Sequence, residues 1–371
     1  MNVGVPTEVK DNEYRVALTP AGAHELSRAG HRVLVQRGAG AGSALPDADF
    51  VAAGATIVDD VEEVWGDAEM ILKVKEPVEV EYHRLRKDLV LFTYLHLAAS
   101  RSCTEALLAS GITAIAYETV QLADGSLPLL APMSEVAGRM APQVGAHHLQ
   151  ADGGGRGVLM GGVSGVYAAK VVVLGAGVSG MNAAAIALGM QAEVLVLDRD
   201  VNKLRSADRI YQGHLQTITS NTYEIERAVL DADLVIGAVL VPGARAPKLI
   251  TSDLVGRMKP GSVLVDIAID QGGCFEGSHP TTHAEPTFAV AASLYYCVAN
   301  MPGAVPHTST FALTNVTLPY ALAIAAHGWR AALGSDPALG LGLNTHDGML
   351  TQPAVAGAHG LAATDPAVLL A

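Results

Sequence analysis

The stretch KVVVLGAGVSGMNAAAIALGMQAEVLVLD, residues 170–198, decides the fold of this chain. It begins with four apolar β-formers at 171–174, which predict a strand buried on both faces. A glycine-rich turn follows, then the small, helix-favouring residues 181–190, and then a second apolar strand over 193–197 that ends at Asp198. This order of strand, turn, helix and strand, with an acid at the tip of the second strand, is typical of a dinucleotide-binding unit.

Three glycines in the turn each have a mechanical reason. Gly175 allows the tight turn, Gly177 lets a pyrophosphate approach the backbone, and Gly180 lets the helix pack closely on the strand. The helix N-terminus would then offer free N–H groups and the positive end of its dipole to the phosphates. The plainer interpretation is a glycine-rich turn that only packs a helix on a sheet. The flanking strands and the acid at Asp198 favour the dinucleotide site.

Asp198 also indicates which dinucleotide is bound. Its carboxylate would accept hydrogen bonds from both ribose hydroxyls, whereas a 2′-phosphate would meet a negative charge there. The sequence therefore predicts NAD, although the neighbouring Arg199 softens this preference.

Residues 171–192 contain no charge, and a hydropathy scan would mark them as a membrane span. Three turn glycines, several alanines and an asparagine make a poor apolar helix, and strand-like runs lie at both ends of the stretch. We therefore expect no membrane span here.

Length and composition indicate a two-domain protein that associates with itself. The 371 residues are enough for two domains that each bury a core. Only 16% of the residues are charged and the mean hydropathy is +0.31, so subunit contacts are expected to hide apolar area. The formal net charge of -13 argues against nucleic acid or an anionic membrane as a partner.

The cysteines and the N-terminus favour a cytoplasmic location. Cys103, Cys274 and Cys297 are an odd number without CxxC spacing, which suits reduced thiols better than a disulfide framework. Met1 leads directly into a strand-like NVGVP, without the basic and apolar regions of a signal peptide.

Helical and strand-like segments alternate along most of the chain, which predicts parallel α/β sheets. Because the dinucleotide unit lies in mid-chain, we predict a Rossmann domain, residues 131–305, inserted into a second, discontinuous α/β domain. This substrate domain would comprise residues 1–130 and 306–371, with a proline-broken hinge at 127–132. Ser134 would cap a helix that runs towards Gln150, and Pro142 would cause either a kink or a late start.

Polar side chains that follow predicted strands are candidates for chemistry, since α/β enzymes collect functional residues at strand ends. Lys75, His96 and Asp270 each follow an apolar run, and Arg15 lies in a loop after the first strand. Each has an ordinary structural interpretation: a snorkelling lysine, a hydrogen-bonded histidine, a turn-capping aspartate, or an arginine paired with Glu13 on the surface. Together they supply two cations for a carboxylate, an imidazole for proton transfer and an acid near the nicotinamide.

Long segments of the chain resemble bacterial alanine dehydrogenases. They are GVPTEVKDNEYRVALTPAG, LKVKEP, LFTYLHLAA, AIAYETV, APMSEVAGRMA, AVLVPGARAPKLIT, MKPGSVLVDIAIDQGG and VANMPGAVPHTSTFALTN. The resemblance implies NAD-dependent oxidative deamination of L-alanine to pyruvate and ammonium, or the reverse reductive amination, generally by homohexamers. It also implies a fold similar to the soluble NAD-binding subunit of proton-translocating transhydrogenase.

The same resemblance implies roles for individual residues. Arg15 and Lys75 would hold the substrate carboxylate, and His96 would be the general acid and base. Asp270 would hold the amino group and help to deprotonate it or the attacking water. The residues implied to contact the cofactor are Ser134, Gly175, Gly177, Val178, Gly180, Asp198, Lys203, Ser220, Val239, Leu240, Asn300 and Met301.

Two other functions stay open at this point. A transhydrogenase-like subunit would hold NAD(H) for a partner without its own amino-acid substrate. Lys75, the DQGG motif that starts at Asp270 and the APMSEVAG loop argue against it. Another amino-acid or opine dehydrogenase, such as a saccharopine enzyme, would share the fold.

We expect no bound metal. His279, His283 and Glu285 could gather around a cation, but their spacing is not a zinc pattern and they lie in a polar loop. The adjacent His147 and His148 would point in different directions on a helix, so they form no chelating pair.

Overall fold

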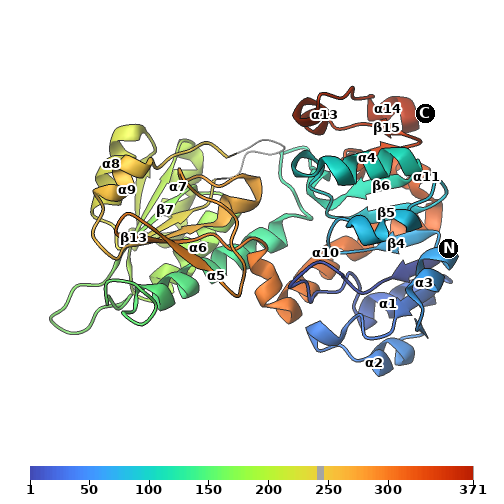
Figure 1. The fold of residues 1–371 in the computed structure, drawn as a ribbon, viewed down its shortest axis with the longest axis horizontal. Helices are drawn as coiled ribbons and strands as arrows, with labels where there is room; N and C mark the ends of the chain where they lie inside the picture. Colours follow the sequence, from blue (N-terminus) through green and yellow to red (C-terminus); the bar gives the residue numbers. More distant parts are fainter. Residues whose placement is uncertain (240–245, 371) are drawn as a thin grey trace. The chain divides into compact units, whose positions relative to one another are not determined.

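The computed structural model describes residues 1–239 and 246–370, and in it the chain forms two compact units (Figure 1). Unit 1 comprises Met1–Met133 and Val305–Ala371, and unit 2 comprises Ser134–Ala304. The chain therefore leaves unit 1 once, builds unit 2, and returns to complete unit 1. Each unit has its own sheet and its own buried core.

Unit 1 contains an eight-stranded sheet with the order β15-β14-β6-β5-β4-β1-β2-β3. The six strands β1 to β6 run parallel to one another, and β14 and β15 extend the sheet in antiparallel fashion. The order reverses between β1 and β4, which makes this pair the switch point of a doubly wound sheet. The strands are β1 (Asn2–Val5), β2 (Arg32–Gln36), β3 (Thr56–Val58), β4 (Met70–Leu72), β5 (Val90–Thr93), β6 (Thr113–Ala116), β14 (Leu343–His346) and β15 (Met349–Leu350).

Four helices of unit 1, α1, α3, α4 and α12, begin at residues whose side chains cap the first turn. At α1, the Thr19 side chain accepts a hydrogen bond from the Gly22 N–H, and Pro20 occupies the first turn, where its missing N–H costs nothing. The helices are α1 (Pro20–Arg28), α2 (Asp47–Ala52), α3 (Val61–Asp67), α4 (Arg101–Ser110), α10 (Pro306–His327), α11 (Trp329–Ser335), α12 (Pro337–Gly340), α13 (Pro353–His359) and α14 (Pro366–Leu370). Four 3₁₀ helices join them: η1 (Ala41–Ser43), η2 (Glu79–Arg84), η3 (Leu97–Ala99) and η4 (Tyr117–Thr119).

Unit 2 contains a seven-stranded sheet with the order β12-β13-β11-β10-β7-β8-β9. Only β12 runs antiparallel, and the other six strands have the order of a Rossmann sheet, with the switch point between β7 and β10. The strands are β7 (Lys170–Leu174), β8 (Glu193–Asp198), β9 (Gln216–Thr219), β10 (Leu234–Gly237), β11 (Val263–Asp266), β12 (Thr287–Val290) and β13 (Ser293–Tyr296).

The helices of unit 2 pack on both faces of this sheet (Figure 1). They are α5 (Ala131–Leu149), whose first turn belongs to unit 1, α6 (Val178–Gly189), α7 (Val201–Tyr211), α8 (Thr222–Leu230) and α9 (Ser252–Gly256), with the 3₁₀ helices η5 (Ile267–Gln271) and η6 (Met301–Ala304). A Cβ at Gly138 would lie 2.2 Å from the Ser179 carbonyl oxygen, so glycine lets α5 approach the start of α6.

The structure confirms the predicted strand, turn, helix and strand over residues 170–198. Val171 to Leu174 are at most 3% exposed, as expected for a strand covered on both faces. Residues 171–192 are divided between β7, the turn and α6, so they do not form one membrane-spanning helix. Within the described residues, α10 is the one helix long and apolar enough to cross a membrane, and 44% of its apolar window is buried inside the structure.

The prediction for Ser134 is wrong, and of the two effects expected of Pro142 the late helix start is excluded. Ser134 lies inside α5 rather than at its N-cap, because the helix already begins at Ala131 and Pro132 fits its first turn. Pro142 does not delay the helix, which continues through it to Leu149. Beyond α12 the chain also forms the short strands β14 and β15, which the sequence analysis did not predict and which extend the unit 1 sheet.

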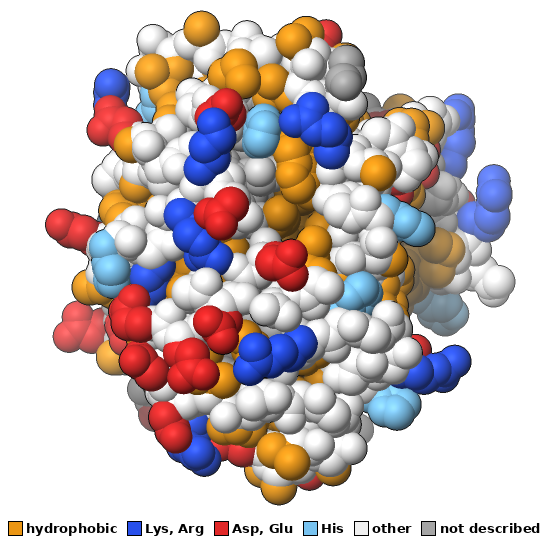
Figure 2. All heavy atoms as spheres, turned by 90° about the vertical axis from the view of Figure 1, so that its right-hand side faces the viewer, with side chains coloured by type: hydrophobic (Ala, Val, Ile, Leu, Met, Phe, Trp, Pro, Cys, Tyr) orange, Lys and Arg blue, Asp and Glu red, His pale blue; other side chains and the backbone are white. Residues whose placement is uncertain are grey.

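Surface charges contribute little to this fold. On the face in Figure 2, acidic side chains gather in several groups with Lys and Arg side chains between them. Exposed ion pairs such as Lys87 with Asp347, 2.6 Å apart, are each worth about 0–1 kcal/mol. Stability therefore comes mainly from the two apolar cores and from the few ionic groups that are buried.

Candidate functional site

The switch point of the unit 1 sheet collects three of the predicted site residues. β1, β4 and β5 are consecutive neighbours and run parallel, so their carboxyl ends share one edge of the sheet. Arg15 belongs to the loop after β1, Lys75 follows β4, and His96 follows β5. Doubly wound sheets bind their ligands at this kind of edge.

Arg15 is held in a buried fork by Glu13. Its Nε and Nη2 donate to the two carboxylate oxygens of Glu13 over 2.7 Å and 2.5 Å, and Nη1 lies 2.9 Å from Sδ of Met133. Burial would lower the pKa of Arg15, but hydrogen bonds and attraction from Glu13 outweigh it and raise the pKa. Arg15 does pair with Glu13, but the pair is buried, with Arg15 only 2% exposed.

A buried ionic triad fixes the segment that carries Lys75. Lys73 Nζ lies 3.0 Å from Glu8 Oε2 and 2.9 Å from Glu81 Oε1, and all three side chains are at most 2% exposed. The other oxygen of Glu8 accepts a 2.6 Å hydrogen bond from the backbone N–H of Val74. Glu8 therefore ties the loop after β1 to the residue just before Lys75.

His96 has a left-handed backbone conformation, with φ 47° and ψ 38°. This conformation costs a non-glycine residue roughly 1–2 kcal/mol, and the carboxylate of Glu118 stabilises it. The His96 N–H donates to Glu118 Oε1 over 2.6 Å, and the Leu95 N–H lies 3.1 Å and 3.2 Å from the two oxygens. The Tyr94 ring stacks on the imidazole with 5.7 Å between ring centroids. The orientation of His96 is therefore set by its neighbours.

Glu76 shares this edge with the cations. Burial would raise the pKa of Glu76, but attraction to Lys75, His96 and Lys10 outweighs burial and lowers the pKa. One of its oxygens pairs with Lys10, while Oε2 is buried without a hydrogen-bond partner among the described residues. The edge thus offers buried cations and an imidazole, with carboxylates that offset part of the positive charge.

The glycine turn of unit 2 has the geometry that its sequence predicts. Gly175 has a φ of +107°, and a Cβ there would lie 2.6 Å from the carbonyl oxygen of Ala238, at the switch point between β7 and β10. A Cβ at Gly180 would lie 1.8 Å from the Gly175 carbonyl oxygen, so the helix contacts the strand directly. A Cβ at Gly177 would meet none of the described atoms within 4 Å, which leaves open space for a pyrophosphate.

Asp198 lies at the tip of β8 and contacts this turn. Its Oδ2 accepts a 2.6 Å hydrogen bond from the Ala176 N–H, and its Oδ1 accepts one of 2.8 Å from the Asp200 N–H. Lys203 Nζ lies 4.0 Å from the same carboxylate, and the Ser220 N–H donates to the Asp198 carbonyl. The predicted ribose-binding acid, its neighbouring lysine and the serine are therefore brought together, and the residues fit a dinucleotide.

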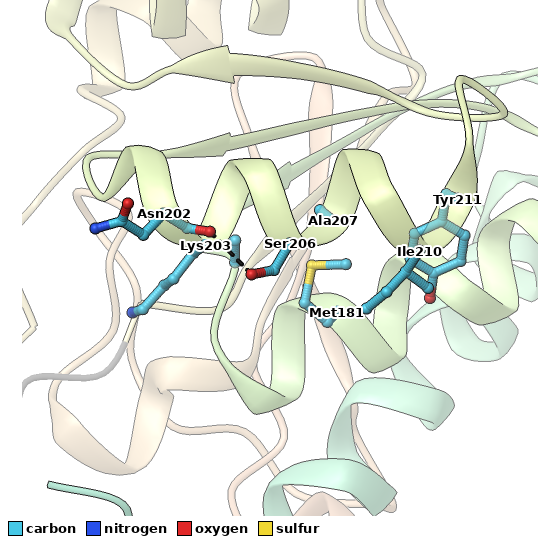
Figure 3. Close-up of a pocket in the computed structure, with 8 residues that line it drawn as sticks. Met181, Asn202, Lys203, Ser206, Ala207, Ile210 and Tyr211 are labelled. Atoms are coloured by element: carbon cyan, nitrogen blue, oxygen red, sulfur yellow. Dashed lines mark hydrogen bonds between the residues drawn. The ribbon is translucent and has the colours of Figure 1, made fainter. Parts of the chain in front are cut away.

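A shallow cavity of about 310 Å³ lies beside the turn, between α6 and α7. Figure 3 shows Met181 of α6 facing the α7 side chains across it, with the Ser206 hydroxyl bonded to the Asn202 carbonyl. The lining residues are Ala176, Met181, Asn202, Lys203, Ser206, Ala207, Ile210 and Tyr211. The cavity is largely apolar. Lys203 lines it, and the ammonium of Lys203 lies 4.0 Å from the Asp198 carboxylate.

The remaining cofactor candidates of unit 2 lie in different settings. Val178 is 44% exposed at the start of α6, and Val239 follows β10, with Cγ2 3.3 Å from where a Gly175 Cβ would be. Asn300 is left-handed, with φ 62°, whereas Met301 is only 3% exposed and packs in the core. Ser134 is half-buried inside α5. Leu240 lies outside the described residues.

Asp270 belongs to η5, beyond the end of β11, and is exposed. Asp270 was expected to follow a strand directly, but β11 ends at Asp266, whose side chain caps the following 3₁₀ helix by accepting from the Ala268 N–H. Asp270 is therefore presented by a tight helical turn at the carboxyl edge of the unit 2 sheet.

No group of three His, Cys, Asp or Glu side chains suited to a metal ion occurs in residues 1–239 and 246–370. His279 instead stacks on Phe288, with 3.9 Å between ring centroids.

The sequence interpretation missed Glu8, Lys73 and Glu118 as site residues. Glu118 follows the apolar run AIAY, so the strand-end rule that selected His96 would also have selected it.

Comparisons with known proteins agree over both units. The family models "Alanine dehydrogenase/PNT, N-terminal domain" and "Alanine dehydrogenase/PNT, C-terminal domain" match residues 4–137 and 141–353. The chain is 64% identical to an alanine dehydrogenase of Mycobacterium tuberculosis over 371 residues, with all of both chains covered.

Solved structures give the same result. An L-alanine dehydrogenase structure superimposes with a TM-score of 0.93 at 50% identity, covering 97% of this chain and 99% of that one. A transhydrogenase from Sinorhizobium meliloti superimposes less closely, with a TM-score of 0.78 at 25% identity, covering 95% of this chain and 100% of that one. With its two matched domains and its full-length likeness, this chain belongs to the alanine dehydrogenase/PNT family.

Proposed function

We propose that this chain is an NAD-dependent L-alanine dehydrogenase, which converts L-alanine to pyruvate and ammonium and runs the reverse reductive amination. The observation that carries the proposal is the full-length likeness to alanine dehydrogenases, at 64% identity. A transhydrogenase-like subunit is less well supported, because the likeness to that structure falls to 25% identity.

Unit 1 supplies the substrate contacts in this proposal. Arg15 and Lys75 bind the α-carboxylate, because a guanidinium can engage both of its oxygens while an ammonium adds a second positive charge. Glu13 holds Arg15 in one orientation before the substrate arrives, which lowers the entropy cost of binding. A small amino acid with a free carboxylate is therefore the favoured substrate class.

His96 and Asp270 handle the protons. The substrate ammonium must lose a proton before Cα can be oxidised, and the water that later adds to Cα must lose one too. Imidazole, with a reference pKa of about 6.5, can both accept and return such protons. Asp270 holds the amino group and assists the deprotonation of the amine or the water, so its exposed position at the sheet edge suits its role.

Unit 2 holds the cofactor. Gly177 leaves room for the pyrophosphate in a turn that Gly175 and Gly180 shape, and Asp198 receives the ribose hydroxyls. When bound there, the nicotinamide would supply the acceptor for the hydride of the amino acid's Cα. Residues 131–305 therefore form the NAD-binding domain, and residues 1–130 with 306–371 form the substrate domain.

We further propose that the chain forms a homohexamer and works in the cytoplasm. Self-association is supported by a group of exposed apolar side chains in one segment: Leu159, Val163, Val166 and Tyr167, which are 62%, 62%, 64% and 94% exposed. The location is supported by the three cysteines, which are all buried and free.

The test is NADH formation by the purified chain alone, with NAD and L-alanine at alkaline pH. L-Serine, L-valine and lysine plus 2-oxoglutarate serve as competing substrates. The highest specificity constant is expected for L-alanine, and His96→Ala should lower turnover by roughly 100-fold or more. Turnover only with lysine plus 2-oxoglutarate, or none without a partner protein, would point to one of the other two functions.

A further inference from the structure

Lys248 makes an unusual set of contacts in unit 2. Its ammonium donates three hydrogen bonds to backbone carbonyls, to Gly272 over 2.6 Å, Gly273 over 2.9 Å and Phe275 over 2.9 Å. An ammonium has three donors, so these bonds use all of them. All three carbonyls belong to the loop that directly follows Asp270.

The backbone on either side of Lys248 is bonded to the same loop. The Ala246 N–H donates to the Gln271 carbonyl over 3.0 Å, and the Leu249 N–H donates to the Cys274 carbonyl over 2.7 Å. Ile250 forms an isolated parallel bridge with Phe275. Residues 246–250 therefore run alongside the loop, and Lys248 adds a side-chain clamp in the middle of this contact.

Asp266 also holds this loop, but it accepts hydrogen bonds from the loop's donors. Its carboxylate accepts from the N–H of Cys274 over 2.9 Å, from the N–H of Phe275 over 3.3 Å and from the Ser278 hydroxyl over 2.7 Å. Asp266 is fully buried, at 0% exposed, so its carboxylate needs these donors. An anion thus binds N–H groups of the loop while Lys248 binds its carbonyls.

Two left-handed glycines make this clamp necessary. Gly272 and Gly273 have φ values of +86° and +72°, and a Cβ at Gly272 would meet no described atom within 4 Å. Glycines in this conformation are the most flexible backbone of the loop. The carbonyl groups that Lys248 binds are those of the two glycines and of Phe275, so the ammonium holds backbone that has no side chain of its own at residues 272 and 273.

We propose that Lys248 is a positioning residue that fixes Asp270 for catalysis by binding the carbonyls of residues 272, 273 and 275. The inference rests on the proposed role of Asp270 in the dehydrogenase reaction. Without the clamp, the two glycines let η5 and Asp270 move. A displacement of about 1 Å in a catalytic group can lower a rate by up to about 100-fold.

Lys248→Met tests the proposal, because methionine keeps much of the side-chain length and removes the ammonium. Lys259→Met is the matched control in the same unit. Lys259 Nζ also donates to a backbone carbonyl, that of Asp231 over 2.6 Å, but it lies before β11, at the amino ends of the strands. It pairs there with Asp231 and Asp233 rather than with the Asp270 loop.

Three measurements on the full chain separate the outcomes. For Lys248→Met we expect kcat for L-alanine oxidation to fall by about tenfold or more, with the Kd for NADH changed by less than about threefold. Hydrogen–deuterium exchange should become faster in peptides that cover residues 267–276. Lys259→Met should leave all three unchanged, and Lys248→Arg should restore part of kcat, because a guanidinium can still donate to carbonyls.

An unchanged kcat in Lys248→Met would overturn the proposal, even if the loop exchanged faster. It would also be overturned if the NADH affinity fell as much as kcat, because Lys248 would then act on the cofactor. If Lys259→Met lowered kcat as much as Lys248→Met, the loss would reflect general destabilisation, and the proposal would also be overturned. Failure of the proposed function is distinguishable, because wild-type protein would then form no NADH from L-alanine.

Discussion

The backbone N–H of His96 lies 2.6 Å from Oε1 of Glu118, and this hydrogen bond holds a histidine in the left-handed conformation at the end of β5. A hydrogen bond to a charged acceptor is worth about 1.5–3 kcal/mol, comparable to the cost of that conformation. The direction in which the imidazole points therefore depends on Glu118. Without Glu118 the turn would relax, and His96 would spend less time in the position proposed for proton transfer.

Replacing Glu118 should therefore impair turnover. We expect Glu118→Ala to lower kcat for L-alanine oxidation by roughly tenfold or more, and Glu118→Gln to lower it less, since an amide oxygen still accepts N–H bonds. Glu105 is the control, because it is exposed and pairs with Arg101 on the surface of α4. Steady-state kinetics would contradict this account if Glu118→Ala and Glu105→Ala had equal effects.

Arg15→Lys should weaken substrate binding. Lysine cannot reproduce the planar fork that engages both Glu13 and a carboxylate, so we expect kcat/KM for L-alanine to fall by roughly 10- to 100-fold. The Kd for NADH should change little. Arg37→Lys is the control, because Arg37 pairs with Asp59 on the surface. A normal kcat/KM in Arg15→Lys would remove Arg15 from the carboxylate site.

Lys73→Met should destabilise unit 1. The substitution leaves Glu8 and Glu81 buried without their shared cation, and breaking a buried ion pair in this way costs about 3–5 kcal/mol. Lys87→Met, which removes an exposed pair with Asp347, should cost less than about 1 kcal/mol. Urea unfolding followed by circular dichroism measures both variants, and equal midpoints would show that the triad contributes nothing.

The cysteines should make stability fall at high pH. Burial raises the pKa of the Cys103 and Cys297 thiols to about 12, above the usual value of 9.0. Below pH 9 both states keep their protons, but between pH 9 and pH 12 only the unfolded chain loses them, so the folded state loses stability across this window. Thermal unfolding against pH should show the loss, and Cys103→Ala should reduce it, because only Cys297 of the two thiols then remains.

The same burial predicts slow thiol chemistry. At pH 8–9 the native protein should react with iodoacetamide far more slowly than the urea-unfolded chain, in which all three cysteines become available. Mass spectrometry after short labelling would count the modified thiols. Rapid labelling of native Cys103 or Cys297 would contradict their burial.

The parts of this protein that local sequence determines were predictable. The strand over residues 171–174 is apolar throughout and β-branched at its three valines, and Gly175 needs its positive φ, so β7 and its turn could be read directly. The strand-end rule also placed Asp198 at the tip of β8, and Lys75 and His96 after β4 and β5. The positions of these residues in the fold depend only on where a strand ends.

Contacts between distant segments were not predictable. Nothing in the local sequence shows that Glu8 bonds to the Val74 N–H or that Lys73 is buried, because these pairings follow from the order of strands in the sheet. The C-terminal strands β14 and β15 were missed for the same reason: they are short and form as partners of β6. Ser134 was misplaced because Pro132 was taken as a break, although proline is compatible with a first helical turn.

The central claim is that this chain alone removes the hydrogen at Cα of L-alanine and transfers it to NAD. The most direct test is to supply L-alanine deuterated at Cα and to analyse the reduced cofactor by mass spectrometry. The account predicts reduced NAD that carries one deuterium, formed by the wild type and strongly diminished in His96→Ala. Reduced cofactor without deuterium, or none at all, would contradict it.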